Sequence, residues 1–238
     1  MKKHIWHPVE GYPELFVGQY LVPGFMSNSV AVQVGEKTWL VMSPGAGLLD
    51  DWSRICPDPD VEITLICPNS FHYMGVSDWL ARFPEARVFA SAKASTRLRK
   101  KGLAQVQVIS DSAPRLPSDY FWRIPPGHRG GDIWLCKRPS SRSRQGGVWI
   151  ICDSFLNYQR KSNRWLARTV QTLADAAPGL KLSRVIKWVL LDNRRAFRPW
   201  VLKELASESP SLLIPMHGEP LESPDIGVQL ARIVKETL

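Results

Sequence analysis

Four short apolar runs in this chain have the length and composition of buried strands, and each is followed within a few residues by a side chain that can bind a metal. These side chains are His72, His128, Asp153 and His217. Taken singly, each is explained as a hydrogen-bonded surface residue, a helix cap or an ordinary loop residue. The spacing nevertheless constrains the chain to a sheet protein that carries polar side chains where its strands end.

The order of the expected elements favours two sheets. Strands are expected over Leu15–Leu21, Ser29–Val34, Thr38–Met42, Val61–Cys67, Arg87–Ala90, Gln105–Ile109, Tyr120–Ile124, Asp132–Lys137, Val148–Cys152 and Leu212–Ile214. Helices are expected before Ile55, over Val76–Arg82 and Ala92–Lys101, and where apolar residues recur at helical spacing from Leu166, Phe197 and Ile226. The polar segment 138–147 is expected to be a loop. Strands, helices, more strands and more helices suggest an α+β fold of two stacked sheets with helices on both outer faces.

Size and composition are those of one globular domain, which we assign to residues 1–238, because 44% of the residues are hydrophobic and 22% are charged. No apolar run approaches the roughly 20 residues that a membrane helix needs. The segment Met1–Pro8 lacks the apolar core of a secretory signal. The cysteines, at positions 56, 67, 136 and 152, show no C-x-x-C spacing, which predicts reduced, buried thiols in a cytoplasmic protein.

The net charge of +9 is compatible with two classes of partner. Basic residues cluster at 97–101, 137–144, 160–168 and 194–195, and the ten tryptophans could stack on single-stranded bases. No groove-reading motif accompanies them, so an anionic small-molecule substrate explains the charge as well. We expect the tryptophans to pack in the core, with Trp165, Trp188 and Trp200 on the apolar faces of helices.

The region around His72 resembles the first metal-binding loop of metallo-β-lactamase-fold proteins, which reads Thr-His-x-His-x-Asp-His-x-Gly-Gly. Aligned without gaps, Val61–Cys67 matches the preceding strand, Phe83-Pro84 matches the end of the following helix, and His72 is the last His of the loop. The two earlier His positions then fall on Cys67 and Asn69, and the Asp position falls on Phe71. The resemblance therefore includes the loss of part of the family's metal site.

The other candidates also lie in segments similar to this family, and the match covers roughly residues 15–235. Pro126-Gly127-His128 resembles the Pro-Gly-His loop, Cys152-Asp153 resembles the strand end with the bridging Asp, and Met216-His217-Gly218 resembles the closing Gly-His-Gly. Ser43 stands where the family usually has Asp. The resemblance implies a four-layer αββα sandwich with these loops at one cleft.

The resemblance also implies which metal site survives. Of the ligands of one family site this chain keeps His128 and Asp153, and of the other it keeps His72, Asp153 and His217. Because catalytic zinc needs three protein ligands and an open position, we expect at most one zinc ion, bound by the second set with His128 near, or none. Asp153 and His72 are the expected catalytic residues.

Three functions stay open. The first is a hydrolase of a small ester, thioester, lactone or phosphodiester. The second is a non-catalytic member of the fold that binds a ligand in the old pocket. The third, binding of nucleic acid, rests on charge alone. The sequence does not indicate an oligomeric state.

Overall fold

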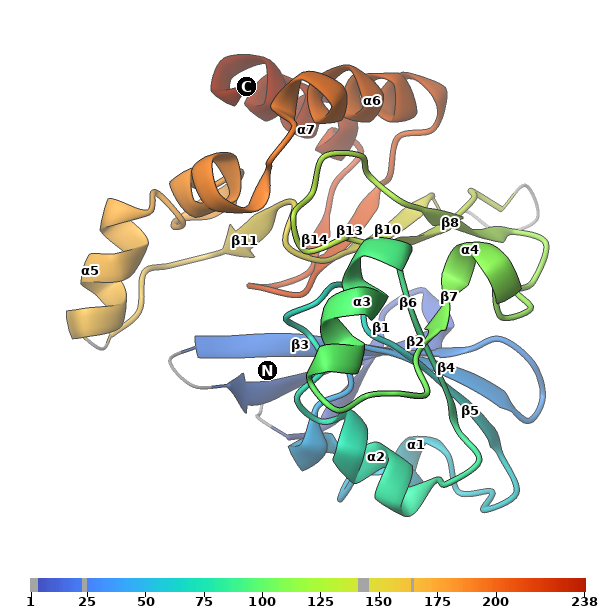
Figure 1. The fold of residues 1–238 in the computed structure, drawn as a ribbon. Helices are drawn as coiled ribbons and strands as arrows, with labels where there is room; N and C mark the ends of the chain where they lie inside the picture. Colours follow the sequence, from blue (N-terminus) through green and yellow to red (C-terminus); the bar gives the residue numbers. More distant parts are fainter. Residues whose placement is uncertain (1–3, 23–24, 141–145, 164) are drawn as a thin grey trace. The chain divides into compact units, whose positions relative to one another are not determined.

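The computed structural model describes residues 4–22, 25–140, 146–163 and 165–238. The chain divides into two compact units, Met1–Pro117 and Ser118–Leu238, and each has a mixed sheet with its own helices (Figure 1). The assignment of residues 1–238 to one domain stays a prediction, and the expected loop 138–147 lies partly outside the described residues. Among the described helices, none is long and apolar enough to cross a membrane.

The first unit is built on a seven-stranded sheet in the order β1-β2-β3-β4-β5-β6-β7. Strands β1 to β4 pair antiparallel, whereas β4 to β7 pair parallel. The strands are β1 (Trp6–Val9), β2 (Tyr12–Val22), β3 (Phe25–Gln33), β4 (Thr38–Met42), β5 (Glu62–Ile66), β6 (Arg87–Ala90) and β7 (Gln107–Val108). The helices are η1 (Ala46–Leu48), α1 (Trp52–Ile55), α2 (Val76–Arg82), α3 (Ala92–Lys100) and α4 (Ile109–Ser112).

An aromatic cluster holds the helices of this unit against the sheet. Alternate residues of a strand point to opposite faces, so Trp39 of β4 lies on the same face as Leu65 of β5. Trp52 of α1 contacts both Trp39 and Trp79 of α2, with ring centroids 5.3 and 5.0 Å apart. These rings belong to one buried core. The core fixes α2, and with it the loop between β5 and α2 that carries His72.

The second unit is built on a five-stranded sheet in the order β14-β13-β10-β9-β8, and β11 pairs separately with β12. In the larger sheet only β10 and β13 pair parallel. The strands are β8 (Tyr120–Arg123), β9 (Trp134–Lys137), β10 (Val148–Ile151), β11 (Leu156–Tyr158), β12 (Gly179–Lys181), β13 (Leu212–Pro215) and β14 (Leu221–Glu222). The helices are α5 (Trp165–Leu173), the π-helical turn η2 (Ile186–Leu190), α6 (Arg194–Ser207) and α7 (Ile226–Thr237).

Helices α6 and α7 cover one face of this sheet. The apolar repeats predicted for them, at Phe197-Val201-Leu205 and Ile226-Leu230-Val234, are buried in one core with Trp134, Trp149 and Leu213 of the strands. The predicted amphipathic period therefore faces the sheet in both helices.

Most of the expected elements are confirmed, and the strand expected over Val61–Cys67 is the interior strand β5 (Glu62–Ile66), between β4 and β6. The prediction of a strand over Gln105–Ile109 was too long, because Ile109 already begins α4. The prediction that Trp165 and Trp188 pack in the core was wrong, since their exposed fractions are 78% and 61%. Trp200 does pack against the core.

Candidate metal centre

His72 lies in the loop between β5 and α2, and Asn69 gives that loop its shape. The side-chain oxygen of Asn69 accepts hydrogen bonds from the backbone N–H groups of Phe71 (2.8 Å) and His72 (3.2 Å). This is the local turn that Asn side chains commonly stabilise. Asn69 occupies the position of a family His, and in this chain it positions the loop.

Hydroxyl groups from two other strands orient the His72 ring. Its Nδ1 lies 2.9 Å from Ser43 Oγ and 3.3 Å from Ser27 Oγ, and Ser43 Oγ lies 2.8 Å from the hydroxyl of Tyr20. His72 itself is buried, with 6% of its surface exposed. A metal-binding imidazole uses one nitrogen for the metal and hydrogen-bonds through the other. In this arrangement Nε2 of His72 is the ring nitrogen that could bind a metal.

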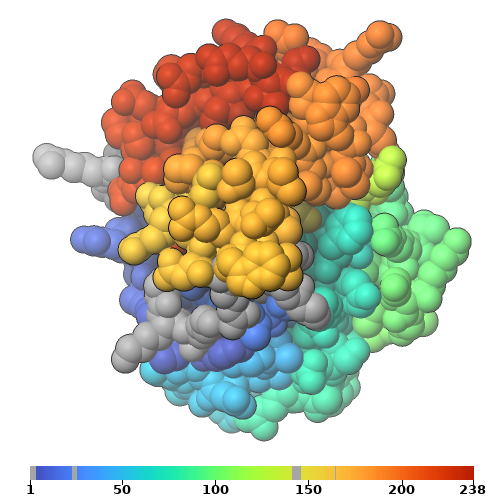
Figure 2. Space-filling model, turned by 90° about the vertical axis from the view of Figure 1, so that its left-hand side faces the viewer, coloured from blue at the N-terminus to red at the C-terminus, as the bar shows by residue number. Residues whose placement is uncertain are grey.

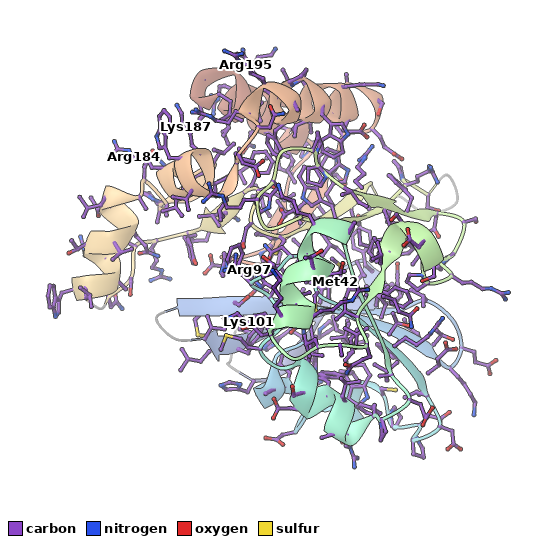
Figure 3. The ribbon with its side chains drawn as sticks, in the orientation of Figure 1. Met42, Arg97, Lys101, Arg184, Lys187 and Arg195 are labelled. Carbon is purple, nitrogen blue, oxygen red and sulfur yellow. The ribbon has the colours of Figure 1, made fainter. Side chains whose placement is uncertain are left out.

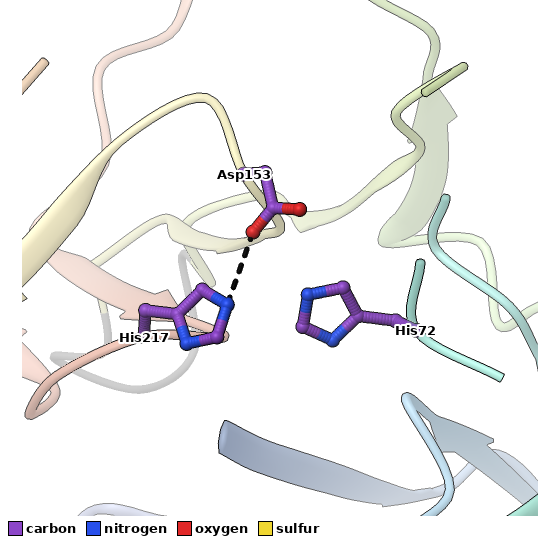
Figure 4. A group of neighbouring side chains, drawn as sticks. All are labelled: His72, Asp153 and His217. Atoms are coloured by element: carbon purple, nitrogen blue, oxygen red, sulfur yellow. Dashed lines mark ion pairs between the residues drawn. The ribbon is translucent and has the colours of Figure 1, made fainter. Parts of the chain in front are cut away.

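Asp153 and His217 meet because they follow adjacent parallel strands. Ile151 of β10 is in register with Pro215 of β13, and the backbone N–H of Met216 donates to the carbonyl of Ile151 at 3.0 Å. Both strands thus end at the same edge of the sheet. His217 Nε2 lies 3.2 Å from Asp153 Oδ1, as Figure 4 shows by a dashed line. An imidazole and a carboxylate are therefore paired at this edge.

The loop that carries His217 is fixed by Asn157. The N–H of Asn157 donates to the carbonyl of His217 at 3.0 Å, and the N–H of Glu219 donates to the carbonyl of Asn157 at 2.7 Å. Gly218 has φ 96°, and a Cβ there would overlap the backbone of Asn157.

Burial, and then the negative charges of Asp153 and Glu219, raise the pKa of Tyr158 to about 12. The Tyr158 hydroxyl therefore keeps its proton beside this loop.

His128 packs beside a buried carboxylate that sequence reasoning missed. Asp132 is fully buried, and one of its oxygens lies 3.6 Å from His128 Nδ1. The same side chain accepts a hydrogen bond from Ser154 Oγ at 2.6 Å and a longer one from the N–H of Asp153 at 3.4 Å. Asp132 thus ties the His128 loop to the end of β10. The signal that could have revealed it is an Asp placed directly after Gly130-Gly131 in the same loop.

His128 is not in the group of candidate ligands formed by His72, Asp153 and His217. The residue is 1% exposed, and within the described part of the chain neither ring nitrogen has a hydrogen-bond partner. Its predicted place near a metal stays a prediction.

The positions at which this chain departs from the family hold side chains in other roles. Cys67 is fully buried in the core of the first unit, and burial raises the pKa of its thiol to about 12. A thiol binds metal as the thiolate, so the protonated Cys67 is a poor ligand. The ring of Phe71 lies under the guanidinium of Arg97, 4.7 Å from it. The four cysteines are all buried and free, as predicted.

No protein-family model matches the chain, and no curated protein sequence matches it either. Solved structures do match over its whole length. DIM-1 metallo-beta-lactamase has a TM-score of 0.62 at 9% identity, covering 98% of this chain and 99% of that one. A metallo-beta-lactamase from Hirschia baltica has a TM-score of 0.59 at 13% identity, covering 97% and 98%.

A third match is the flavodiiron protein from Giardia intestinalis, with a TM-score of 0.65 at 14% identity. It is covered over 60% of its length by the whole of this chain. At such identities the likeness shows the fold alone. The chain has the metallo-β-lactamase fold, an αββα arrangement of two mixed sheets flanked by helices.

Proposed function

We propose that this chain is a metal-dependent hydrolase that binds a single metal ion through His72, Asp153 and His217. The observation that carries the proposal is the Asp153–His217 pair at 3.2 Å, placed where two parallel strands end in a metallo-β-lactamase fold. His72 contributes an imidazole whose Nδ1 is already held by hydroxyls. These three side chains form a group that could hold one metal ion.

The donor set fits one zinc ion better than it fits magnesium or calcium. Two imidazoles and one carboxylate are ligands that zinc accepts, and three protein ligands are the usual number at a catalytic zinc. Magnesium and calcium prefer oxygen ligands. A second ion does not fit, because Cys67 is a buried thiol with a raised pKa, Asn69 supports its own loop, and Phe71 has no donor atom.

When bound, a zinc ion of this kind lowers the pKa of a water molecule to about 7 and makes hydroxide available for hydrolysis. The residues have separate tasks. The contact between Asp153 and His217 holds the two side chains at one point before a metal binds, and Asp153 could also accept a proton from the attacking water. Ser43 holds the His72 ring in place.

The substrate that we propose is a small anionic ester, thioester, lactone or phosphodiester. Arg97 supports an anionic substrate, because its exposed guanidinium lies over Phe71, the neighbour of His72. We place the protein in the cytoplasm, since its cysteines are free thiols. The second candidate is a binding protein without catalysis, which the changed positions 67, 69 and 71 favour.

Metal titration of the purified full chain tests the proposal. After stripping with a chelator and addition of zinc, we expect at most one ion per chain. Asp153→Ala and His217→Ala should each weaken zinc binding by at least about tenfold, because each removes one of three ligands. Cys67→Ser is the matched control and should bind like the unaltered protein.

Two tightly held zinc ions, or undiminished zinc in Asp153→Ala, would contradict the proposed site. Turnover of an ester and phosphodiester panel then separates the two candidate functions. If the chain binds zinc but shows no turnover, or only turnover that persists in Asp153→Ala, the result would favour the binding protein.

A further inference from the structure

Helix α5 turns its apolar side to solvent. Trp165, Leu166, Val170 and Leu173 have exposed fractions of 78%, 61%, 56% and 68%, and no residue of α5 is buried. At about 100° per residue these four side chains share one side of the helix. Helices on globular proteins usually show the reverse arrangement, with the apolar stripe against the core. Figure 2 shows the gold segment that contains α5 on the face turned to the viewer.

Specific contacts hold the helix in this orientation. The side chain of Gln171, on the opposite side of α5, accepts a hydrogen bond from the N–H of Ser162 at 2.7 Å. At the C-terminal end, the N–H of Arg184 donates to the carbonyl of Ala174 at 2.7 Å, and its guanidinium donates to that of Leu173 at 3.3 Å. These contacts tie α5 at both ends to the segments that flank it in the chain.

More exposed apolar residues follow in η2, which begins two residues after Arg184. Trp188 and Val189 are 61% and 48% exposed. The ring of Trp188 is flanked by two cations, with Lys187 Nζ 4.9 Å and the Arg194 guanidinium 4.3 Å from its centroid. We call Trp165, Leu166, Val170, Leu173, Trp188 and Val189 the apolar face.

Basic residues lie beside the apolar face at Leu173 and Trp188. Residues 160–198 hold ten of the 31 Lys and Arg residues of the chain and only two of its 22 Asp and Glu residues. Arg184 and Lys187 project on the side of the second unit where α5 lies (Figure 3). Arg194, Arg195 and Arg198 line a cavity of about 330 Å³ together with Pro199 and Leu238. Nearly all of the net charge of +9 is thus concentrated in this segment.

We propose that the apolar face docks on an anionic lipid surface. Interfacial helices combine Trp and Leu on one side with basic residues beside them, and they bind by inserting the apolar side among acidic headgroups. A second copy of the chain fits less well, because two such basic segments would repel each other. Nucleic acid would match the charge and could stack on the tryptophans, but it has no apolar surface that would bury Leu166, Val170 and Leu173.

Vesicle flotation with the full-length protein tests this inference independently of the metal site. At low salt we expect binding to vesicles of equal parts phosphatidylglycerol and phosphatidylcholine to exceed binding to pure phosphatidylcholine by at least about tenfold, and to weaken with added salt. The double variant Leu166→Gln/Leu173→Gln should lose at least about tenfold in binding. Arg195→Gln/Arg198→Gln should lose binding to the anionic vesicles. Val228→Gln, at an exposed apolar position of α7 (72%), should bind like the unaltered protein.

Equal binding of the two vesicle types, or undiminished binding of Leu166→Gln/Leu173→Gln, would overturn the proposal. Sedimentation velocity tests whether a second copy of the chain binds the apolar face. Mobility shifts with single-stranded and duplex nucleic acid test whether nucleic acid binds it. A dimer that the leucine variant dissociates, or nucleic-acid binding that outcompetes the vesicles, would also overturn it.

Discussion

Side chains far from His72 in sequence decide how its ring is held. Ser27, Ser43 and Tyr20 come from three strands of the first sheet or their ends, and the first two contact Nδ1 of the ring. Ser43 reaches it from a left-handed backbone conformation, with φ 55°. The donated hydrogen bond from a ligand imidazole fixes both its tautomer and its direction.

Ser43→Ala should therefore lower zinc affinity by about 10- to 100-fold, which is the usual effect of removing such a partner. Tyr20→Phe is the matched control, because it removes the hydroxyl behind Ser43 but keeps the Ser43–His72 contact. Both variants should lose about 0.5–1.5 kcal/mol of unfolding free energy, because each removes a buried hydrogen bond. Calorimetric zinc titration and urea denaturation separate the two effects. Unchanged zinc affinity in Ser43→Ala would show that the hydroxyl does not position His72.

Candidate site residues could be predicted from the sequence where they follow strongly apolar strands. Residues whose roles depend on tertiary contacts could not. Asp153 and His217 could be predicted as a pair because β10 and β13 are short, apolar and followed by the family's loop residues. Asp132 could not, because its importance comes from four groups separated from it by 2 to 22 residues. Ser43 stood out only as a departure from the family's Asp.

At the scale of elements, hydrophobic periodicity identified helices but not the direction of their apolar sides. The same helical spacing occurs in α6, where Phe197 and Val201 are fully buried, and in α5, where Leu166 and Val170 are exposed. Periodicity measures amphipathicity and does not tell which side of a helix packs on the core. Very short strands were also missed, because the two residues of β14 carry no pattern.

The turn after His217 requires glycine for two separate reasons, which a pair of variants can distinguish. Gly218 and Gly102 both have φ 96°, but a Cβ at Gly218 would overlap Asn157, whereas at Gly102 no atom lies within 4 Å. Gly102→Ala should cost about 1–2 kcal/mol of unfolding free energy, the price of a left-handed backbone alone. Gly218→Ala should cost about 2 kcal/mol more and should also weaken zinc binding. Urea denaturation of both variants measures the difference. Equal losses would show that Asn157 does not restrict this turn.

At the scale of the whole molecule, the two proposed sites differ in the units to which their residues belong. The apolar face belongs entirely to the second unit, Ser118–Leu238. The proposed ligands come from both units, since His72 belongs to the first and Asp153 and His217 belong to the second. Metal binding should therefore couple the stability of the units, whereas lipid binding should depend on one of them.

Zinc should raise the melting temperature of the full chain, and residues of both units should be needed for the rise. At a zinc concentration about 100 times Kd, binding to the native state alone adds about 2.7 kcal/mol, which corresponds to about 5–10 °C for a chain of this size. His72→Ala and His217→Ala should each abolish most of this increase, although they lie in different units. His7→Ala, outside the candidate group, should retain it. Calorimetric scans with zinc and with excess chelator measure the shift. If His72→Ala keeps the full increase, the metal is bound by the second unit alone, and the three-ligand site is wrong.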